Sequence, residues 1–284
     1  MLKSKIIIGS AQFGLNYGIS NVIGKTPINE VDKILSLAKK ASIEFIDTSP
    51  NYGNSEITLG KLKNYNFKLI SKFIANDKDE LNKSLLKSLN DLKSKKLYAF
   101  LAHRPENVLK NKILWSYLNE IKNSGKVSKI GFSYNNVEEI NYCIKLNMIP
   151  DIIQIPFNIF DSRFLDLAIY LKNQYNTEIH SRSTFLQGLF FMDPNNLPSS
   201  LSLFKNQLIK LSILSKKNIL KLSLNYVLNN RNIDKVVIGV ENKQQLESLL
   251  NSIENSNLDF LKNEFKFNNN EKNLLSPSKW NLIK

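Results

Sequence analysis

The chain has 284 residues, enough for one large α/β domain or two small ones. Its 42% hydrophobic and 23% charged residues are ordinary for a soluble globular protein, and since no apolar run approaches the roughly 20 residues of a membrane span, we expect no membrane partner. The net charge of +14 comes mainly from scattered lysines rather than from arginines clustered with aromatic residues, so we expect no nucleic-acid partner but an attraction for anionic ligands.

Strand and helix patterns alternate along the whole chain. The first expected strand is Ile6–Gly9, and a glycine-rich loop separates it from a helix over Glu30–Lys40. The later expected strands are Ile43–Asp47, Lys68–Lys72, Leu97–His103, Val127–Ser133, Ile152–Pro156, Glu178–Ser183 and Lys235–Gly239. The later expected helices are Glu56–Leu62, Asp79–Lys93, Lys112–Asn123, Val137–Leu146, 161–175, two segments within Leu201–Asn229 that break near Asn218, and Lys243–Ile253.

Eight strand–helix repeats with short connections predict a parallel sheet, because parallel neighbours require crossover connections. At this length the pattern favours an α/β fold of the closed (β/α)₈ barrel type, as a single domain over residues 1–255. Residues 256–284 form a polar tail that is a candidate cover for the barrel mouth. An open, doubly wound sheet is the alternative, but its glycine fingerprint is absent after the first strand.

The cellular compartment is indicated by the amino terminus and by cysteine usage. Residues Met1 to Gly9 lack the apolar core of a signal peptide and have the pattern of an immediate strand. Cys143 is the single cysteine, which excludes an internal disulfide and fits a reducing compartment. Because Cys143 lies in an amphipathic segment, we expect a packed thiol in a cytoplasmic protein.

Four ionisable side chains lie at the ends of successive expected strands. Asp47 closes the second strand, Tyr52 follows it across a Ser-Pro-Asn turn, and Lys72 and His103 close the next two. Taken singly, the aspartate, the tyrosine and the histidine have ordinary structural explanations, whereas a lysine that ends an apolar run is rarely buried unpaired. Together at one barrel mouth they predict an active site for a polarised carbonyl. His180 lies inside the seventh strand, apart from the other ionisable residues at the strand ends, and is expected to be structural.

The segment from Asp47 to Glu56, followed by Leu59-Gly60, resembles the signature of the aldo-keto reductases. Further similar motifs follow in the order of that family, and the resemblance runs from about Ile6 to about Leu250. These motifs are Gly9–Gly14, Lys72, His103–Asn107, Ile130–Ser133, Gln154 with Pro156 and Asn158, Ser183–Gly188 and Val237–Gly239.

The resemblance implies a catalytic tetrad of Asp47, Tyr52, Lys72 and His103 without a metal ion. In this interpretation a nicotinamide cofactor delivers a hydride to a carbonyl carbon, and Tyr52 protonates the oxygen. Lys72 favours the phenolate, Asp47 orients the lysine, and His103 hydrogen-bonds the carbonyl oxygen. The expected activity is NAD(P)H-dependent reduction of an aldehyde or ketone to an alcohol.

The resemblance also implies a cofactor, NADPH with NADH as the alternative. The residues expected to hold it are Gly9, Ser10, Ser133, Gln154, Arg182, Ser183, Gln187, Gly239, Asn242, Lys243 and Gln245. Several positions depart from the family pattern. Arg182 stands where an aromatic ring often stacks on the nicotinamide, and Gln245 stands where an arginine commonly contacts the 2′-phosphate, a charge that Lys243 is the candidate to replace. The other departures are Tyr134, Ser248 and Leu249.

Phe13 and Arg104 are the candidate substrate-binding residues, the latter for a carboxylate or phosphate. The expected partner is therefore a small carbonyl compound, either anionic or sugar-derived, as in carbohydrate metabolism. Two alternatives remain beside the reductase. One is a redox-neutral sugar epimerase or lyase that retains its cofactor, and the other is a non-catalytic, cofactor-binding regulatory subunit. The sequence makes no prediction about the oligomeric state.

Overall fold

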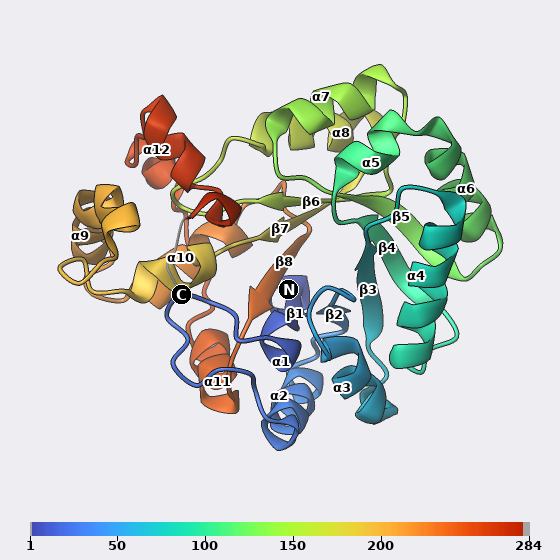
Figure 1. Ribbon diagram of the computed structural model, residues 1–284. Helices are drawn as coiled ribbons and strands as arrows, with labels where there is room; N and C mark the ends of the chain where they lie inside the picture. Colours follow the sequence, from blue (N-terminus) through green and yellow to red (C-terminus); the bar gives the residue numbers. More distant parts are fainter. Residues whose placement is uncertain (1, 281–284) are drawn as a thin grey trace.

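The computed structural model describes residues 2–280 and shows a closed barrel surrounded by helices (Figure 1). Residue 1 of the expected barrel and residues 281–284 of the expected tail lie outside the described residues. The strands are β1 (Ile6–Gly9), β2 (Phe45–Asp47), β3 (Lys68–Phe73), β4 (Leu97–Ala102), β5 (Val127–Ser133), β6 (Ile152–Pro156), β7 (Glu178–Arg182) and β8 (Lys235–Gly239). They pair in chain order, all in parallel, and β8 closes the ring on β1. The predicted (β/α)₈ barrel is confirmed.

Most helices in the described part of the chain lie at the expected places, between the strands or after β8, and three short helices were not predicted from the sequence. They are α1 (Ala11–Gly14), α2 (Ile28–Lys40), α3 (Ser55–Lys61), α4 (Lys78–Asp91), α5 (Pro105–Lys110), α6 (Lys112–Asn123), α7 (Val137–Lys145), α8 (Leu165–Tyr175), α9 (Lys205–Leu214), α10 (Ile219–Leu228), α11 (Lys243–Asn251) and α12 (Asn269–Leu274). Short 3-10 turns are η1 (Leu2–Lys5), η2 (Lys63–Tyr65), η3 (Leu186–Phe191), η4 (Ser199–Phe204), η5 (Asp259–Asn263) and η6 (Pro277–Lys279). None of the helices within residues 2–280 is long and apolar enough to cross a membrane.

Local sequence explains where most helices start. Asp77 accepts a hydrogen bond from the Glu80 backbone N–H and begins α4, and Asn218 accepts one from Lys221, which separates α10 from α9 as predicted. One expected start is wrong: α8 begins at Leu165 rather than at residue 161. Asn158 and Asp161 instead pair in a short antiparallel bridge, which holds that backbone outside the helix.

Side chains alternate between two apolar cores, because successive residues of a strand point to opposite faces. The barrel interior contains a small cluster that comes only from strands. Its buried members are Ile7, Phe45, Ile70, Ala99, Leu101 and Ile152. The larger core lies between the strands and the helices and includes Ile8, Ile46 and Phe100 from the strands and Leu35 and Leu85 from the helices. These interior side chains are buried, and the cavity described below opens at the carboxyl ends of the strands.

The C-terminal tail folds back onto the barrel rather than extending away from it (Figure 1). Phe265 and Phe267 pack against Phe160, which follows β6, with ring centroids 4.8 and 5.4 Å apart. Arg163 Nη1 donates a hydrogen bond to the Lys272 carbonyl at 3.1 Å. These contacts hold α12 and η6 beside the carboxyl ends of the strands.

Cys143 is buried in α7, as expected for a packed thiol. Its Sγ donates to the Met148 carbonyl at 2.6 Å, and burial raises the pKa of the thiol to about 11. The thiol therefore stays protonated and unreactive at neutral pH.

Candidate active site

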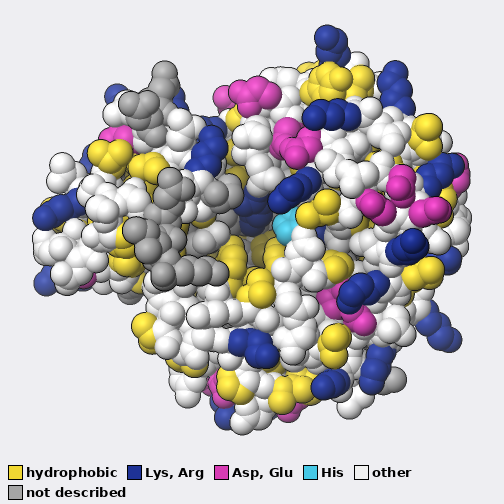
Figure 2. Space-filling view, viewed as in Figure 1, with side chains coloured by type: hydrophobic (Ala, Val, Ile, Leu, Met, Phe, Trp, Pro, Cys, Tyr) yellow, Lys and Arg dark blue, Asp and Glu magenta, His cyan; other side chains and the backbone are white. Residues whose placement is uncertain are grey.

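A cavity of about 1100 Å³ opens at the carboxyl ends of the strands. Figure 2 shows a hollow on this face, with a histidine and several basic side chains around it. Seven of the eight strands contribute a lining residue at this end, either their last inward residue or the residue that follows the strand. In the order β1, β2, β4, β5, β6, β7 and β8, these residues are Gly9, Asp47, His103, Ser133, Gln154, Arg182 and Gly239. The inward-facing strand positions are thus apolar inside the barrel, whereas at the carboxyl ends of the strands they are polar residues or glycine.

Lys72 is the centre of the polar network at the mouth. Its side chain is 1% exposed and forms an ion pair with Asp47. Lys72 Nζ also donates to the Thr48 carbonyl at 3.1 Å and lies 3.4 Å from the Tyr52 hydroxyl. Burial alone would lower the pKa of Lys72, but the charge of Asp47, together with Tyr52 and the hydrogen bonds to both residues, raises the pKa above its ordinary value. The buried amine therefore remains a cation next to the phenol.

Asp47 is held from two sides. One carboxylate oxygen pairs with Lys72, and the other accepts a hydrogen bond from Gln154 Nε2 at 2.7 Å. Gln154, expected to contact the cofactor, also fixes the aspartate. Both carboxylate oxygens of Asp47 are thus occupied, one by the lysine and the other by the amide.

His103 follows β4 and lies across from Tyr52, with the two rings edge-on and their centroids 5.9 Å apart. Its Nδ1 lies 3.4 Å from Ser49 Oγ. Burial, followed by the positive charges of Lys72, Arg182 and Arg104, lowers the pKa of His103 to about 3. The imidazole is therefore neutral at physiological pH, so one ring nitrogen keeps a proton that it can share as a hydrogen-bond donor.

Two glycines allow the loop that carries Tyr52 to pack closely on the loop after β1. A Cβ on Gly14 would lie 1.7 Å from the Tyr52 carbonyl oxygen, and a Cβ on Gly53 would lie 2.4 Å from the Gly14 carbonyl oxygen. Gly53 also has a φ of +57°, which other residues rarely adopt. The glycine in Tyr52-Gly53 thus fixes the position of the phenol through the backbone.

Most of the expected cofactor residues line the same cavity. Those that do are Gly9, Ser10, Ser133, Gln154, Arg182, Ser183, Gln187, Gly239, Asn242 and Gln245. Gly9 and Gly239 are paired neighbours on β1 and β8, and a Cβ on Gly239 would meet the Gln12 side chain at 2.5 Å. A Cβ on Gly9 would meet Val237 Cγ1 at 3.1 Å, so the two glycines make room for the side chains of Gln12 and Val237 at the strand ends. The volume of about 1100 Å³ and the polar groups along the cavity fit a dinucleotide.

Two of the expected residues, Phe13 and Lys243, lie outside this lining. Phe13 is 1% exposed and belongs to the outer core, because the α1 turn directs its ring between helix and barrel. Lys243 does not line the cavity, since its Nζ pairs with Glu247 one turn further along α11 at 3.0 Å. Arg104, the other candidate for the substrate, is exposed and does line the cavity.

The segment after β7 has an unusual backbone. Ser183, Leu186 and Gln187 have φ values of 62°, 47° and 55°, in the left-handed region. Asn158 Nδ2 donates to the Ser183 carbonyl at 2.9 Å, and Ile19 N–H donates to the Gln187 carbonyl at 3.0 Å. Strained residues that surrounding contacts hold in place are concentrated at functional sites, which agrees with their position at the cavity wall.

Several lining residues were not predicted from the sequence. They are Tyr17, Asn135, Glu139, Glu241 and, from the tail, Leu275, Ser276, Pro277 and Lys279. Burial, together with the nearby Tyr52, raises the pKa of Tyr17 to about 12. Arg182 Nη2 donates to Asn135 Oδ1 at 2.7 Å and to the carbonyl of Tyr134 at 2.8 Å. The polar run from Ser133, the last residue of β5, to Asn136 is typical of a loop at a strand end, but only the fold brings this loop to Arg182.

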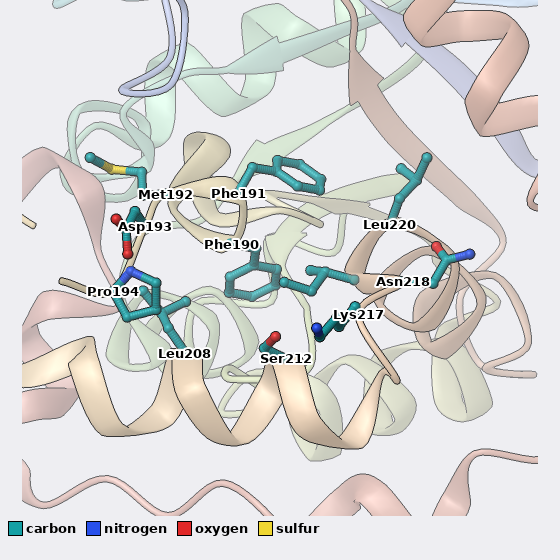
Figure 3. A pocket seen from close by; sticks show the side chains of 11 residues that line it. Phe190, Phe191, Met192, Asp193, Pro194, Leu208, Ser212, Lys217, Asn218 and Leu220 are labelled. Carbon is teal, nitrogen blue, oxygen red and sulfur yellow. The ribbon is translucent and has the colours of Figure 1, made fainter. Parts of the chain in front are cut away.

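A second, smaller hollow of about 480 Å³ lies between η3, α9 and α10 (Figure 3). Its lining includes Phe190, Leu208, Ser212 and Lys217, and it shares Phe191 and Leu220 with the large cavity. No residue predicted to be functional lines it.

Comparisons with known proteins agree with this architecture. A search of curated proteins found no match. Solved structures of similar fold include a putative aldo-keto reductase from Pseudomona aeruginosa (18% identity over 87% of this chain and 88% of that one, TM-score 0.67). They also include a glycerol dehydrogenase from Gluconobacter oxydans (16% identity over 99% of this chain and 94% of that one, TM-score 0.71). A third is an aldo-keto reductase from Bacillus halodurans (18% identity over 92% of this chain and 90% of that one, TM-score 0.71).

The sequence model of the Aldo/keto reductase family matches residues 5–262, which is most of the chain. Proteins of this family are oxidoreductases that act on carbonyl and alcohol groups and generally bind NAD(P)H. With the closed barrel and the cavity at its mouth, the match establishes that the chain belongs to the aldo/keto reductase family.

Proposed function

We propose that the protein uses a nicotinamide dinucleotide to reduce an aldehyde or ketone to an alcohol, with Tyr52 as the general acid. The observation that carries this proposal is the position of Lys72 Nζ, buried and paired with Asp47, 3.4 Å from the Tyr52 hydroxyl. A cation at this distance stabilises the phenolate that remains after proton donation.

The reduced nicotinamide supplies the hydride when the cofactor is bound. As hydride reaches the carbonyl carbon, negative charge develops on the oxygen, and Tyr52 donates its proton there. His103, neutral because its pKa is lowered to about 3, donates a hydrogen bond to the same oxygen and orients the substrate. Lys72 keeps its charge through Asp47, so neither residue has to exchange a proton during the step.

The cofactor is proposed to lie along the strand ends that line the cavity. We expect Ser133 and Gln154 to contact the nicotinamide amide and Ser183 and Gln187 to contact the pyrophosphate, since all four residues line the cavity. The choice between NADPH and NADH depends on the wall of the cavity formed by β8 and α11.

The substrate is proposed to be a small polar carbonyl compound, either an acid or a sugar derivative. Arg104 is exposed at the mouth, one residue after His103, and it forms no ion pair within residues 2–280. A guanidinium in this position suits a carboxylate or phosphate on the substrate. Lys279 and Pro277 also line the cavity, so the tail is proposed to form one wall of the substrate site. The cytoplasmic location stays a prediction.

The test compares Tyr52→Phe with Tyr65→Phe, which removes the same hydroxyl from η2, where it bonds to Asp32. Consumption of reduced cofactor is followed against a panel of sugar aldehydes and small keto acids, and cofactor affinity is measured by fluorescence titration. We expect Tyr52→Phe to lose about 10²-fold or more in turnover, with cofactor affinity near that of the wild type. Tyr65→Phe should keep its activity.

Substantial turnover in Tyr52→Phe would show that another group donates the proton. A wild type that binds cofactor and converts a sugar without net cofactor consumption would favour the redox-neutral epimerase or lyase. Binding without any conversion, in a stable complex with another protein, would favour a regulatory subunit.

A further inference from the structure

The discrimination between NADH and NADPH depends on one wall of the cavity. On the placement proposed above, the dinucleotide runs from the nicotinamide near Ser133 and Gln154 to the pyrophosphate near Ser183 and Gln187. Its adenosine end then lies toward the next wall of the cavity, which is formed by β8, the loop after it and the first turn of α11. The two cofactors differ only in the phosphate on the adenosine ribose, so the charges of that wall decide between them.

Glu241 places a carboxylate on this wall. Its backbone N–H donates to Gln245 Oε1 at 2.9 Å, and Gln245 Nε2 donates back to Glu241 Oε2 at 3.2 Å. Thr26 Oγ1 donates to the Glu241 carbonyl at 3.1 Å. Glu241 lines the cavity and forms no ion pair with any lysine or arginine in the described part of the chain. The carboxylate is therefore held in place with its charge uncompensated.

Lys243, the cation expected at this wall, is turned away from the cavity. Lys243 Nζ pairs with Glu247, and the Lys243 backbone N–H donates to Glu30 Oε1 at 2.9 Å. The Gln245 N–H is taken by Asn242 Oδ1 at 2.8 Å. The amino terminus of α11 thus already has a carboxylate and an amide on its free N–H groups and offers little to a phosphate.

The cations that line the cavity come from other elements. Arg104 follows β4, Arg182 ends β7 and bonds to the loop after β5, and Lys279 belongs to the tail, where its Nζ donates to Asn273 Oδ1 at 2.9 Å. None of them comes from β8 or α11. The net charge of +14 does not compensate for this, because exposed charges beyond about 10 Å are largely screened at ordinary ionic strength.

We propose that the protein binds NADH in preference to NADPH and that Glu241 is the residue that discriminates between them. A fixed carboxylate accepts hydrogen bonds from the ribose hydroxyl groups of NADH, whereas it repels the phosphate that replaces one of them in NADPH. This inference rests on the proposed function for the direction of the dinucleotide, and it replaces the expectation of NADPH.

The experiment measures dissociation constants for both reduced cofactors by fluorescence titration, without any carbonyl substrate. We expect the wild type to bind NADH at least about tenfold more tightly than NADPH. Glu241→Gln keeps the size and removes the charge, so it should improve NADPH binding and reduce the ratio by about tenfold. The control is Glu44→Gln, which makes the same change of charge beside Lys68 at the other end of the barrel and should leave the ratio unchanged.

A wild type that binds NADPH more tightly, or a ratio that does not change in Glu241→Gln, would overturn the proposal. In the first case, loss of NADPH binding in Lys279→Met would identify the tail as the source of the missing charge. Since no turnover is measured, the two proposals fail separately. NADH binding without carbonyl reduction would contradict the function alone, and carbonyl reduction with NADPH preference would contradict this inference alone.

Discussion

The two ends of the barrel carry the same four kinds of ionisable residue. The mouth has Asp47, Tyr52, Lys72 and His103. The base, near the amino ends of the strands, has the matching set Glu178, Tyr98, Lys129 and His180. Each set contains a carboxylate–lysine pair, so composition alone does not tell them apart.

The two sets differ in the residue at the centre. At the mouth the centre is a cation, since Lys72 contacts both Asp47 and Tyr52. At the base the centre is an anion, since Glu178 accepts from Tyr98 at 3.0 Å and from Lys129, and lies 2.7 Å from the imidazole of His180.

A central anion keeps protons on its neighbours, whereas a central cation helps a neighbour to release one. Burial, with Glu178 adding to it, raises the pKa of Tyr98, and none of the four base residues lines the large cavity. We therefore interpret the base set as a structural network, and we propose that the mouth set serves proton donation. The arrangement of charges, rather than the residue types, separates the two.

The largest expected difference between the two ends is that between removing Lys72 and removing Lys129. Lys72→Met leaves Asp47 buried without its partner, so we expect turnover to fall by at least about 10²-fold and stability to fall by about 3 kcal/mol or more. Lys129→Met removes a side chain that is 34% exposed, so turnover should persist and stability should fall by about 1 kcal/mol or less. Urea unfolding and steady-state kinetics measure both. Equal effects of the two variants would refute the distinction between the ends.

The histidines should separate activity from stability. His103→Gln is expected to lower turnover by about 10²-fold while changing stability little, because the imidazole faces the cavity. His180→Gln should keep turnover and lose about 1–3 kcal/mol of stability, because the ring is fully buried and bonded to Glu178. If His180→Gln lost activity without losing stability, the base would not be merely structural.

A pair of glycines sharpens the comparison at the level of the backbone. Gly53 at the mouth and Gly125 at the base have φ values of +57° and +78°, but only Gly53 has atoms within 4 Å of an added Cβ. Gly125→Ala should cost about 1 kcal/mol from conformation alone. Gly53→Ala should cost more and should also lower turnover, because the loop that carries Tyr52 has to shift. Thermal unfolding and kinetics of the two variants measure the difference.

The smallest expected effect is a pH dependence of stability. Because the pKa of His103 is lowered to about 3 in the folded state, the unfolded chain takes up a proton that the folded chain does not. Stability should therefore fall as the pH drops below about 6.5, by about 1 kcal/mol down to about pH 5.5, and His103→Gln should lack this component.

The base contributes to the pH dependence in a separate range. Burial would raise the pKa of Glu178, but its bonds to His180 and Lys129 hold the pKa well below the ordinary value. The stability that the ionised Glu178 contributes is fully present above the ordinary pKa of 4.5 and is lost only as the pH falls below that value. A wild type whose stability stayed constant between about pH 5.5 and 6.5 would contradict the lowered pKa of His103.

The sequence alone predicted the barrel and the mouth set, because both depend on local patterns. Eight apolar runs of strand length alternate with helical periodicity, and a parallel barrel is the fold that accommodates them at this length. Polar residues that end such runs necessarily meet at one rim. Asp47, Lys72 and His103 were therefore recognisable from their positions at the ends of strands.

Tertiary structure decided the direction of side chains outside the strands. The Phe13 side chain lies in the outer core, and the Lys243 ammonium points to Glu247 rather than into the cavity. The backbone N–H of Lys243 donates to Glu30, which is 213 residues away in the sequence. Glu241 and the tail residues reached the cavity by the packing of loops that no local period describes. A strand fixes side-chain direction by its alternation, whereas a loop or the first turn of a helix takes its direction from distant neighbours, and these depend on the whole fold.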